Sequence, residues 1–203
     1  MPIYDHDGTA SREIGKLWDN DGTSSHQIGK AWDNDGTASH PLYSSSVIIR
    51  NNPDHADYVD RAWSDIGYDK FELVPGYFTA VAGHRYVVAG NLGGFASLYE
   101  NQHQSDCTSV FELYIDGHLL VGHYVCSKFE ESGSTIYTAP SGGIKYMTAF
   151  CERRNTWQGD INAQLTMVVD ITELENERGA RFSSANEFFN AYGFFTGSKE
   201  VEV

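Results

Sequence analysis

Basic residues are scarce in this sequence of 203 residues, in which 14 Lys and Arg stand against 28 Asp and Glu for a formal net charge of −14. Nucleic acid and anionic membrane surfaces repel so acidic a chain, so we expect neither as a partner. No apolar run approaches the length that crosses a bilayer, and the first residues lack the apolar core of a signal peptide. We therefore expect synthesis in a cytoplasm, no export by a signal of the chain's own and no membrane insertion.

Cysteine is rare as well, and the sequence contains no catalytic signature. Cys107, Cys126 and Cys151 form no C-x-x-C pair, and an odd number of cysteines is not a disulfide framework, so we expect free thiols kept reduced in the cytosol. The sequence has no G-x-S-x-G element, no phosphate-binding glycine loop and no H-E-x-x-H element. We expect no cofactor, no resident metal and no enzymatic activity.

The residues that are plentiful favour β structure. Hydrophobic residues make up 40% of the chain and aromatic residues 13%, which is enough for a core. The 12 Tyr, 11 Phe and 20 Gly, with only 5 Pro, indicate an all-β protein with many tight turns.

A repeat with a period of 14 residues opens the chain: YDHDGTASREIGKL (4–17), WDNDGTSSHQIGKA (18–31) and WDNDGTASHPLYSS (32–45). The Asp-Gly-Thr elements predict tight turns, and we interpret each unit as one strand plus one turn. In SHQIGKAWD, strict alternation would place His26, Ile28, Lys30 and Trp32 on one face of a strand.

So short a stalk cannot bury a core by itself, and it contains no cysteine, so we expect self-association. In its logic the repeat resembles the β-spiral or β-prism shafts of trimeric viral attachment proteins, which implies a homotrimer. The residues expected to meet their symmetry mates around the axis are Ile14, Trp18, Ile28, Trp32 and Leu42.

Two metal-binding interpretations of the repeat stand beside the simple turn. Asp19-Asn20-Asp21-Gly22 resembles the start of a calcium loop, but Lys30 occupies the position of the bidentate glutamate. His26 and His40 occupy matching positions and could form rings around a threefold axis, although Arg12 takes that place in the first repeat. We favour turns without metal.

We divide the chain into a stalk and linker at 1–46 and a head at 47–203. Strands are predicted near 47–51, 70–75, 84–91, 109–116, 118–127, 134–138, 144–153 and 162–172. This number of short strands with turn signals between them, Asp116-Gly117 above all, predicts a jelly-roll β-sandwich. Ser184 to Glu187 is a capping box for one short helix ending at Gly193, and residues 199–203 are either a frayed end or an edge strand.

Two stretches of the head carry a family resemblance. FELVPG (71–76) with HRYVVAG (84–90) resembles the opening of carbohydrate-binding-like jelly-roll modules in phage tail and fibre proteins. MVVDITEL (167–174), with the aromatic stretch that follows, is similar to their closing motif, although ENERGA (175–180) replaces the usual Gly-Asn-Glu-Pro loop. The stalk repeat also resembles repeats of phage tail proteins. This resemblance implies a virion protein assembled in the host cytoplasm.

Sugar-binding sandwiches present exposed aromatic rings beside amide and carboxylate groups. Candidates in loop-like sequence are Trp157, Asn155, Gln158, Arg154, Trp63 and Tyr99. Each aromatic side chain could instead fill a core or an interface, and Arg154 could bind acidic sugars or pair with the chain's carboxylates. His118 and His123 have opposite parity along one predicted strand, so we expect them to face apart rather than share a metal. Acidic pairs such as Glu130-Glu131 are interpreted as solvated.

The sequence thus predicts a trimeric fibre- or spike-like virion protein. The stalk would attach it to other virion proteins, and the head would bind a host-surface glycan. A purely structural protein that decorates a capsid or tail is the alternative, and a glycosidase fragment acting through Glu130 or Glu173 is a third hypothesis.

Overall fold

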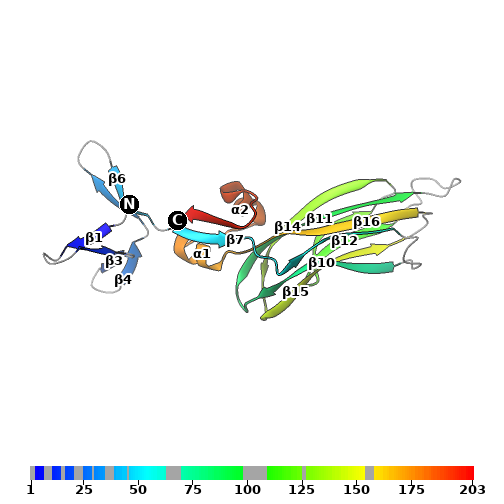
Figure 1. Ribbon diagram of the computed structural model, residues 1–203, viewed down its shortest axis with the longest axis horizontal. Helices are drawn as coiled ribbons and strands as arrows, with labels where there is room; N and C mark the ends of the chain where they lie inside the picture. The colour runs from blue at the N-terminus through cyan, green and yellow to red at the C-terminus, as the bar shows by residue number, and fades with distance from the viewer. Residues whose placement is uncertain are drawn as a thin grey trace. The chain divides into compact units, whose positions relative to one another are not determined.

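The computed structural model describes two compact units of the chain. The described residues are 3–6, 11–14, 17–20, 25–28, 30–34, 39–44, 46–62, 70–97, 109–124, 127–153 and 158–203. For the residues up to 44, the backbone alone is described. One unit contains Met1–Ile49, Glu173–Arg181 and Lys199–Val203, and the other contains Arg50–Thr172 and Phe182–Ser198. The elements are labelled in Figure 1.

Each 14-residue repeat forms a separate two-stranded antiparallel hairpin. The strands are β1 (Ile3–His6), β2 (Ser11–Ile14), β3 (Leu17–Asn20), β4 (Ser25–Ile28), β5 (Lys30–Asn34) and β6 (Ser39–Ser44), which pair as β1–β2, β3–β4 and β5–β6. The prediction of one strand and one turn per repeat was therefore wrong. The SHQIGKAWD stretch contains two strands, β4 and β5, which belong to different hairpins, so strict alternation does not run through it.

The first unit also contains a two-stranded ribbon and a helix. Strand β7 (Ser46–Arg50) pairs with β17 (Ser198–Glu202), so the C-terminal segment is a strand and not a frayed end. Helix α1 (Thr172–Arg178) was not predicted, because Val168 to Thr172 continue a β pattern in sequence. Its TELENER sequence is rich in helix-forming residues, and Glu173 and Glu175 occupy the first turn, where the helix dipole favours negative charge.

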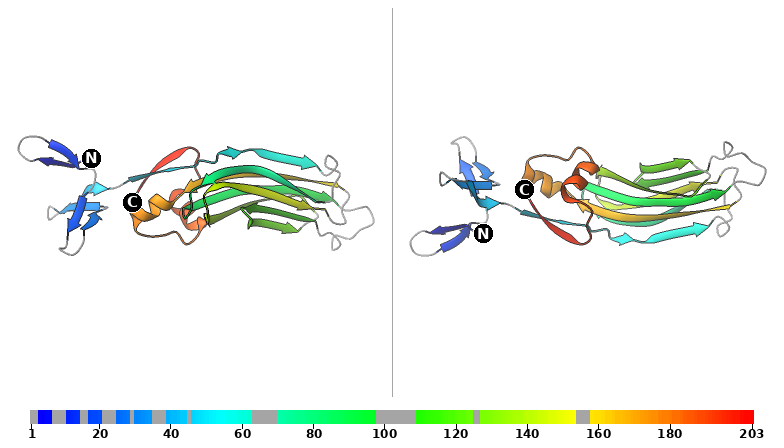
Figure 2. Two further views of the ribbon diagram at one scale, coloured as in Figure 1. Left: turned by 90° about the horizontal axis from the view of Figure 1, so that it is seen from below. Right: turned by 90° about the horizontal axis from the view of Figure 1, so that it is seen from above.

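The second unit is the predicted jelly-roll sandwich (Figures 1 and 2). One sheet has the order β14-β11-β16-β9, and the other has the order β13-β12-β15-β10-β8. The bounds are β8 (His55–Ala56), β9 (Tyr58–Ala62), β10 (Lys70–Ala80), β11 (Arg85–Ser97), β12 (Val110–Ile115), β13 (His118–Tyr124), β14 (Phe129–Thr138), β15 (Gly143–Glu152) and β16 (Gln158–Asp170).

The strand pairing shows why this is a jelly roll. Strand β9 pairs with β16, β10 with β15, β11 with β14 and β12 with β13, all antiparallel. The chain therefore forms one long double ribbon that rolls up, with successive ribbon segments falling alternately into the two sheets. Cross-pairs β11–β16 and β12–β15 then complete the sheets.

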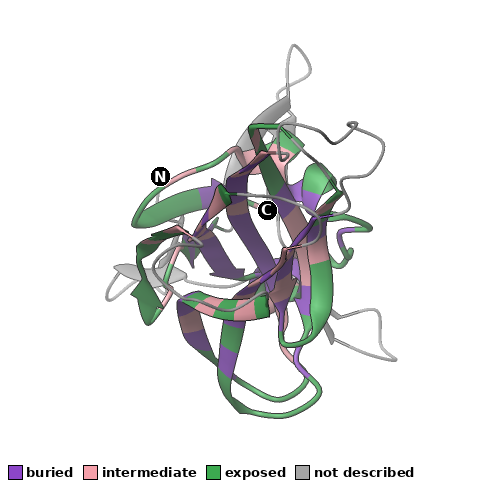
Figure 3. Ribbon diagram, turned by 90° about the vertical axis from the view of Figure 1, so that its right-hand side faces the viewer, coloured by how far each residue is buried: buried purple, intermediate pink, exposed green. Residues whose placement is uncertain are grey.

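Alternating side chains build the core between the sheets. Along β12 the buried Phe111, Leu113 and Ile115 alternate with the half-buried Glu112 and Tyr114. The same period of two appears as bands of buried and exposed residues along the strands in Figure 3. The largest fully buried side chains of this core include Phe78, Phe111, Leu92, Leu113, Ile115, Met147, Ile161 and Leu165.

The predicted C-terminal helix is confirmed as α2 (Ala185–Tyr192), which lies against β11 and β14. The Ser184 side chain accepts a hydrogen bond from the Glu187 N–H, and Gly193 ends the helix with a φ of 71°. The reciprocal half of the capping box is displaced by one residue, because Glu187 Oε2 accepts from the N–H of Ser183 at 2.8 Å.

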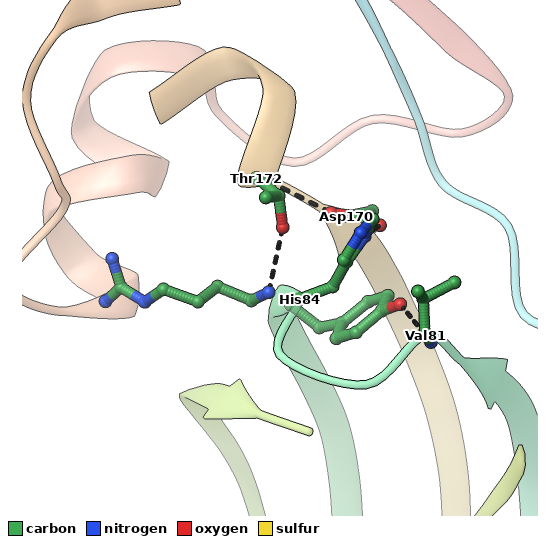
Figure 4. A network of polar contacts seen from close by, with 6 residues as sticks. Val81, His84, Asp170 and Thr172 are labelled. Carbon is green, nitrogen blue, oxygen red and sulfur yellow. Dashed lines mark hydrogen bonds and ion pairs between the residues drawn. The ribbon is translucent and has the colours of Figure 1, made fainter. Parts of the chain in front are cut away.

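A polar network fixes the point where the last long strand leaves the sandwich (Figure 4). The Asp170 carboxylate lies 2.7 Å from His84 Nδ1 and accepts a 3.0 Å hydrogen bond from the Thr172 N–H. Thr172 Oγ1 in turn accepts from the Arg85 N–H at 2.9 Å. Backbone groups at the beginning of β11 and just beyond β16 are thereby satisfied without water.

None of the helices in the described part of the chain has the length and apolarity needed to cross a membrane.

Candidate functional site

The outward face of the β13-β12-β15-β10-β8 sheet carries a row of two carboxylates with an aromatic ring between them. Glu72 on β10 and Glu112 on β12 are both register partners of Phe150 on the intervening strand β15. Register partners share a face of a sheet, and adjacent strands lie about 4.8 Å apart, so the Cα atoms of Glu72 and Glu112 are about 10 Å apart. On β13 the same row ends in Gly122, which has no side chain to cover it.

A hollow of about 320 Å³ lies over this row. Its lining residues are Glu72, Glu112, Tyr114, Gly117, Thr148 and Phe150. We call this set the carboxylate–aromatic hollow. Its rings and carboxylates project from three adjacent strands, so the sheet holds them at fixed spacing. A small, partly apolar ligand with several polar groups fits this size and lining.

Two tyrosine hydroxyls hold the Glu112 carboxylate in place. Tyr114 donates to Oε2 at 2.6 Å, and Tyr124 donates to Oε1 at 3.4 Å. The hydrogen bond to Glu112, followed by desolvation, raises the pKa of Tyr114 from 10.0 to about 12. Tyr114 therefore remains a neutral donor at all physiological pH values, and Glu112 is oriented before any ligand arrives.

Glu72 contrasts with Glu112, because its exposed carboxylate has no hydrogen bond or ion pair within the described part of the chain. The basic side chains of the same sheet are engaged elsewhere. Lys70 forms a 3.0 Å ion pair with Glu152, and the buried Lys145 pairs with Asp116 at 3.2 Å. Within the described residues, no lysine, arginine or histidine lines the hollow.

The two histidines of β13 lie on the same face, contrary to the prediction from parity. His118 pairs with Ile115 and His123 with Phe111, and both partners point into the core. The register shifts between Leu113 and Tyr114, so a bulge on β13 reverses the parity between the two histidines. The His123 ring stacks on Phe129 with 4.4 Å between ring centroids, and His123 Nδ1 lies 3.0 Å from Glu131 Oε1.

The described residues hold no group of three or more His, Cys, Asp or Glu side chains that could bind a metal ion. Cys151 is buried on β15 and forms no disulfide with a described residue. Cys107 and Cys126 lie outside the described residues.

Of the six predicted sugar-binding residues, Gln158 lies in the described part of the chain. Trp63, Tyr99, Arg154, Asn155 and Trp157 lie outside the described residues. Gln158 is exposed at the start of β16, where it pairs with Ser97. For the five predicted stalk contacts, Ile14, Trp18, Ile28, Trp32 and Leu42, the structure gives strand positions alone.

The described residues that flank these segments meet at one end of the sandwich. In one sheet Ala62 pairs with Asp160 near the Ser97–Gln158 pair. In the other sheet the row of Lys70, Glu152, Val110 and Tyr124 ends the four strands. Neither acidic residue considered for hydrolysis is among the lining residues of the hollow: Glu130 is exposed on β14, and Glu173 is exposed in α1.

No family model matches the chain, and no curated protein matches it. Three solved structures of infectious bursal disease virus resemble it weakly. The Gx strain structure has 9% sequence identity and a TM-score of 0.35, and the match covers 80% of this chain. The VP2 subviral particle has 12% sequence identity and a TM-score of 0.34, and the match covers 77% of this chain. The Gt strain structure has 10% sequence identity and a TM-score of 0.34, and the match covers 90% of this chain. The chain spans 43%, 41% and 44% of those viral chains, less than half of each.

Sequence reasoning missed the carboxylate–aromatic hollow, because it searched loops for ligands and treated strands as scaffold. One signal was available: in VFELYI (110–115), Glu112 and Tyr114 occupy the alternate positions that must face outward. Nothing in the sequence indicated that Phe150 and Glu72, at more distant positions, would join them in one row.

Proposed function

We propose that the protein is a structural component of a virion whose jelly-roll head binds a host-surface glycan in the carboxylate–aromatic hollow. The observation that carries the binding proposal is the row Glu112–Phe150–Glu72. An aromatic ring between two carboxylates offers an apolar platform for one face of a sugar ring and hydrogen-bond acceptors for its edges. The resemblance of the sequence to phage tail and fibre proteins supports the assignment to a virion.

In our proposal the stalk joins several heads, so that weak individual sites bind together with high avidity. The three hairpins of the repeat form separate two-stranded sheets, and such ribbons are marginal in water unless partners cover them. A homotrimer would supply that cover and would present three heads on one axis. Three linked weak sites can raise overall affinity by orders of magnitude without a new contact.

The test is binding of the full-length protein to intact cells and to isolated surface polysaccharide, before and after chemical stripping of that polysaccharide. We expect saturable binding that stripping abolishes. Phe150→Ala should weaken it about tenfold, because an aromatic contact contributes about 1.4 kcal/mol. Tyr58→Ala is the matched control, since Tyr58 is an exposed aromatic residue on β9 of the opposite sheet.

Binding that survives stripping, or that responds equally to both substitutions, would contradict the glycan proposal. A protein that ignores sugars but attaches tightly to particles would instead favour a purely structural, decorating role. Release of reducing sugar that is lost on Glu130→Gln or Glu173→Gln would favour the glycosidase hypothesis.

A further inference from the structure

The hydrogen-bonding groups of the carboxylate–aromatic hollow are strongly biased towards acceptors. The carboxylates of Glu72 and Glu112 only accept, and the Tyr114 hydroxyl already donates to Glu112, so its oxygen can only accept another hydrogen bond. Phe150 and Gly117 contribute no polar side-chain atom. Thr148 has the one side-chain hydroxyl of the lining that remains free to donate within the described contacts.

The negative charge of the hollow also favours a ligand that donates hydrogen bonds and carries a positive charge. Two carboxylates face one small hollow, with no basic side chain among the described lining residues to neutralise them. Lys70, two residues before Glu72 on β10, forms an ion pair with Glu152. The chain as a whole carries a formal charge of −14, so its field adds to the local negative potential. This negative potential repels anionic sugars, and a neutral sugar brings no positive charge to balance the two carboxylates.

We infer that the glycan bound in the carboxylate–aromatic hollow carries a free ammonium group, as an amino sugar without N-acetylation does. The ammonium lies between Glu72 and Glu112 and donates to both, while the sugar ring stacks on Phe150. An ammonium group has three donors and no acceptor, which complements this lining better than a hydroxyl does. Phe150 and Tyr114 both line the hollow, so an ammonium group bound there is close enough to their rings for cation–π attraction. This inference rests on the proposed function.

The test compares a β-1,4-linked glucosamine tetramer with its fully N-acetylated counterpart, in which each ammonium group is replaced by a neutral and larger acetamido group. Both are titrated into the full-length protein by calorimetry at pH 6. We expect the free amine to bind at least tenfold more tightly, and we expect its affinity to fall with added NaCl. Glu72→Gln and Glu112→Gln should each weaken the amine ligand about tenfold and leave the acetylated ligand almost unchanged.

Glu130→Gln is the control for charge alone. It removes one exposed carboxylate from β14 of the other sheet, so it changes the net charge by the same amount without touching the hollow. An equal loss with Glu130→Gln would show that the amine is attracted to the acidic surface in general and would overturn the inference. Thermal unfolding of each variant confirms that the fold is intact.

The outcomes separate this inference from the proposed function. Equal affinity for the two tetramers, or tighter binding of the acetylated one, overturns the ammonium assignment and leaves glycan binding standing. If neither tetramer binds while surface polysaccharide binds in a Phe150-dependent manner, the ammonium assignment also fails. If neither the tetramers nor the polysaccharide bind, both proposals fall.

Discussion

Asp116, in the turn between β12 and β13, forms a 3.2 Å ion pair with the buried Lys145 of β15. It also accepts a hydrogen bond from the hydroxyl of Tyr137, which belongs to β14 of the opposite sheet. One turn residue therefore links both layers of the sandwich. Asp116 has a φ of 47°, which Asp and Asn tolerate better than other side chains with a Cβ atom.

This arrangement predicts an acid-sensitive contribution to stability. The Tyr137 hydrogen bond, and after it Lys145, lowers the pKa of Asp116 below its ordinary value of 3.8. Because the folded pKa is depressed, the stabilisation is complete above about pH 4 and is lost as the pH falls through the folded value. Asp116→Asn keeps the turn but leaves Lys145 without its counter-ion, so the free energy of unfolding should drop by about 1–3 kcal/mol at pH 7.

Urea unfolding at pH 7 and pH 3 checks this prediction. The difference between the wild-type protein and Asp116→Asn should shrink at pH 3, because below the ordinary pKa of 3.8 the unfolded chain binds a proton at Asp116 and the advantage of the folded carboxylate falls. A difference of constant size at both values would show that Asp116 acts through shape and not through charge.

A close approach at Gly133 predicts a site that tolerates no side chain. A Cβ atom there would lie 2.3 Å from Val121 Cγ2 and 2.8 Å from the Leu120 carbonyl oxygen. Gly133→Ala should therefore lower the free energy of unfolding by about 1–3 kcal/mol. At Gly142 the nearest atom would be 3.4 Å away, so Gly142→Ala should change stability by less than about 0.5 kcal/mol. Similar urea midpoints for the two variants would refute the packing argument.

The N-terminus of α2 depends on Ser184. Ser184→Ala removes the side-chain acceptor of the Glu187 N–H and should cost about 1 kcal/mol, measured by urea unfolding. Asn186→Ala, in the exposed first turn of the same helix, should be neutral or slightly stabilising because alanine has the higher helix propensity. Equal destabilisation by both changes would mean that the cap contributes nothing specific.

The contact between Tyr114 and Glu112 can be followed by titration. Because the Glu112 carboxylate stabilises the neutral phenol, Glu112→Gln should move the pKa of Tyr114 from about 12 towards 10.0. Carbon-13 NMR of labelled tyrosine rings reports this shift, and Tyr114→Phe assigns the signal. An unchanged pKa in the Glu112→Gln protein would show that desolvation, not the hydrogen bond, sets it.

The trimer predicted from the repeat remains to be measured. Light scattering on the full-length protein should give three times the chain mass, whereas the double substitution Trp18→Ser and Trp32→Ser should give monomers because it removes apolar surface from the proposed axis. A chain beginning at Val47 should also be monomeric. A full-length protein of single-chain mass would refute the stalk argument.

The sequence alone determined the β class, the repeat, the jelly roll and the capped helix. These features follow from local signals: the period-two pattern of VFELYI, the Asp116-Gly117 turn, and Ser184 three residues before Glu187. Each signal lies within a few residues, where propensity and capping act directly. Such local patterns still misassigned the repeat unit and helix α1, because the ends of short elements depend on partners that the pattern does not name.

Only the tertiary structure decided which residues share a surface. The bulge between His118 and His123 reversed a parity that the sequence made clear, since one extra residue on a strand turns every later side chain to the other face. Glu72, Glu112 and Phe150 form one row because β15 lies between β10 and β12. That order arises from the rolling of the long ribbon. It brings together residues that are far apart along the chain, and their positions in the sequence do not predict that they are neighbours.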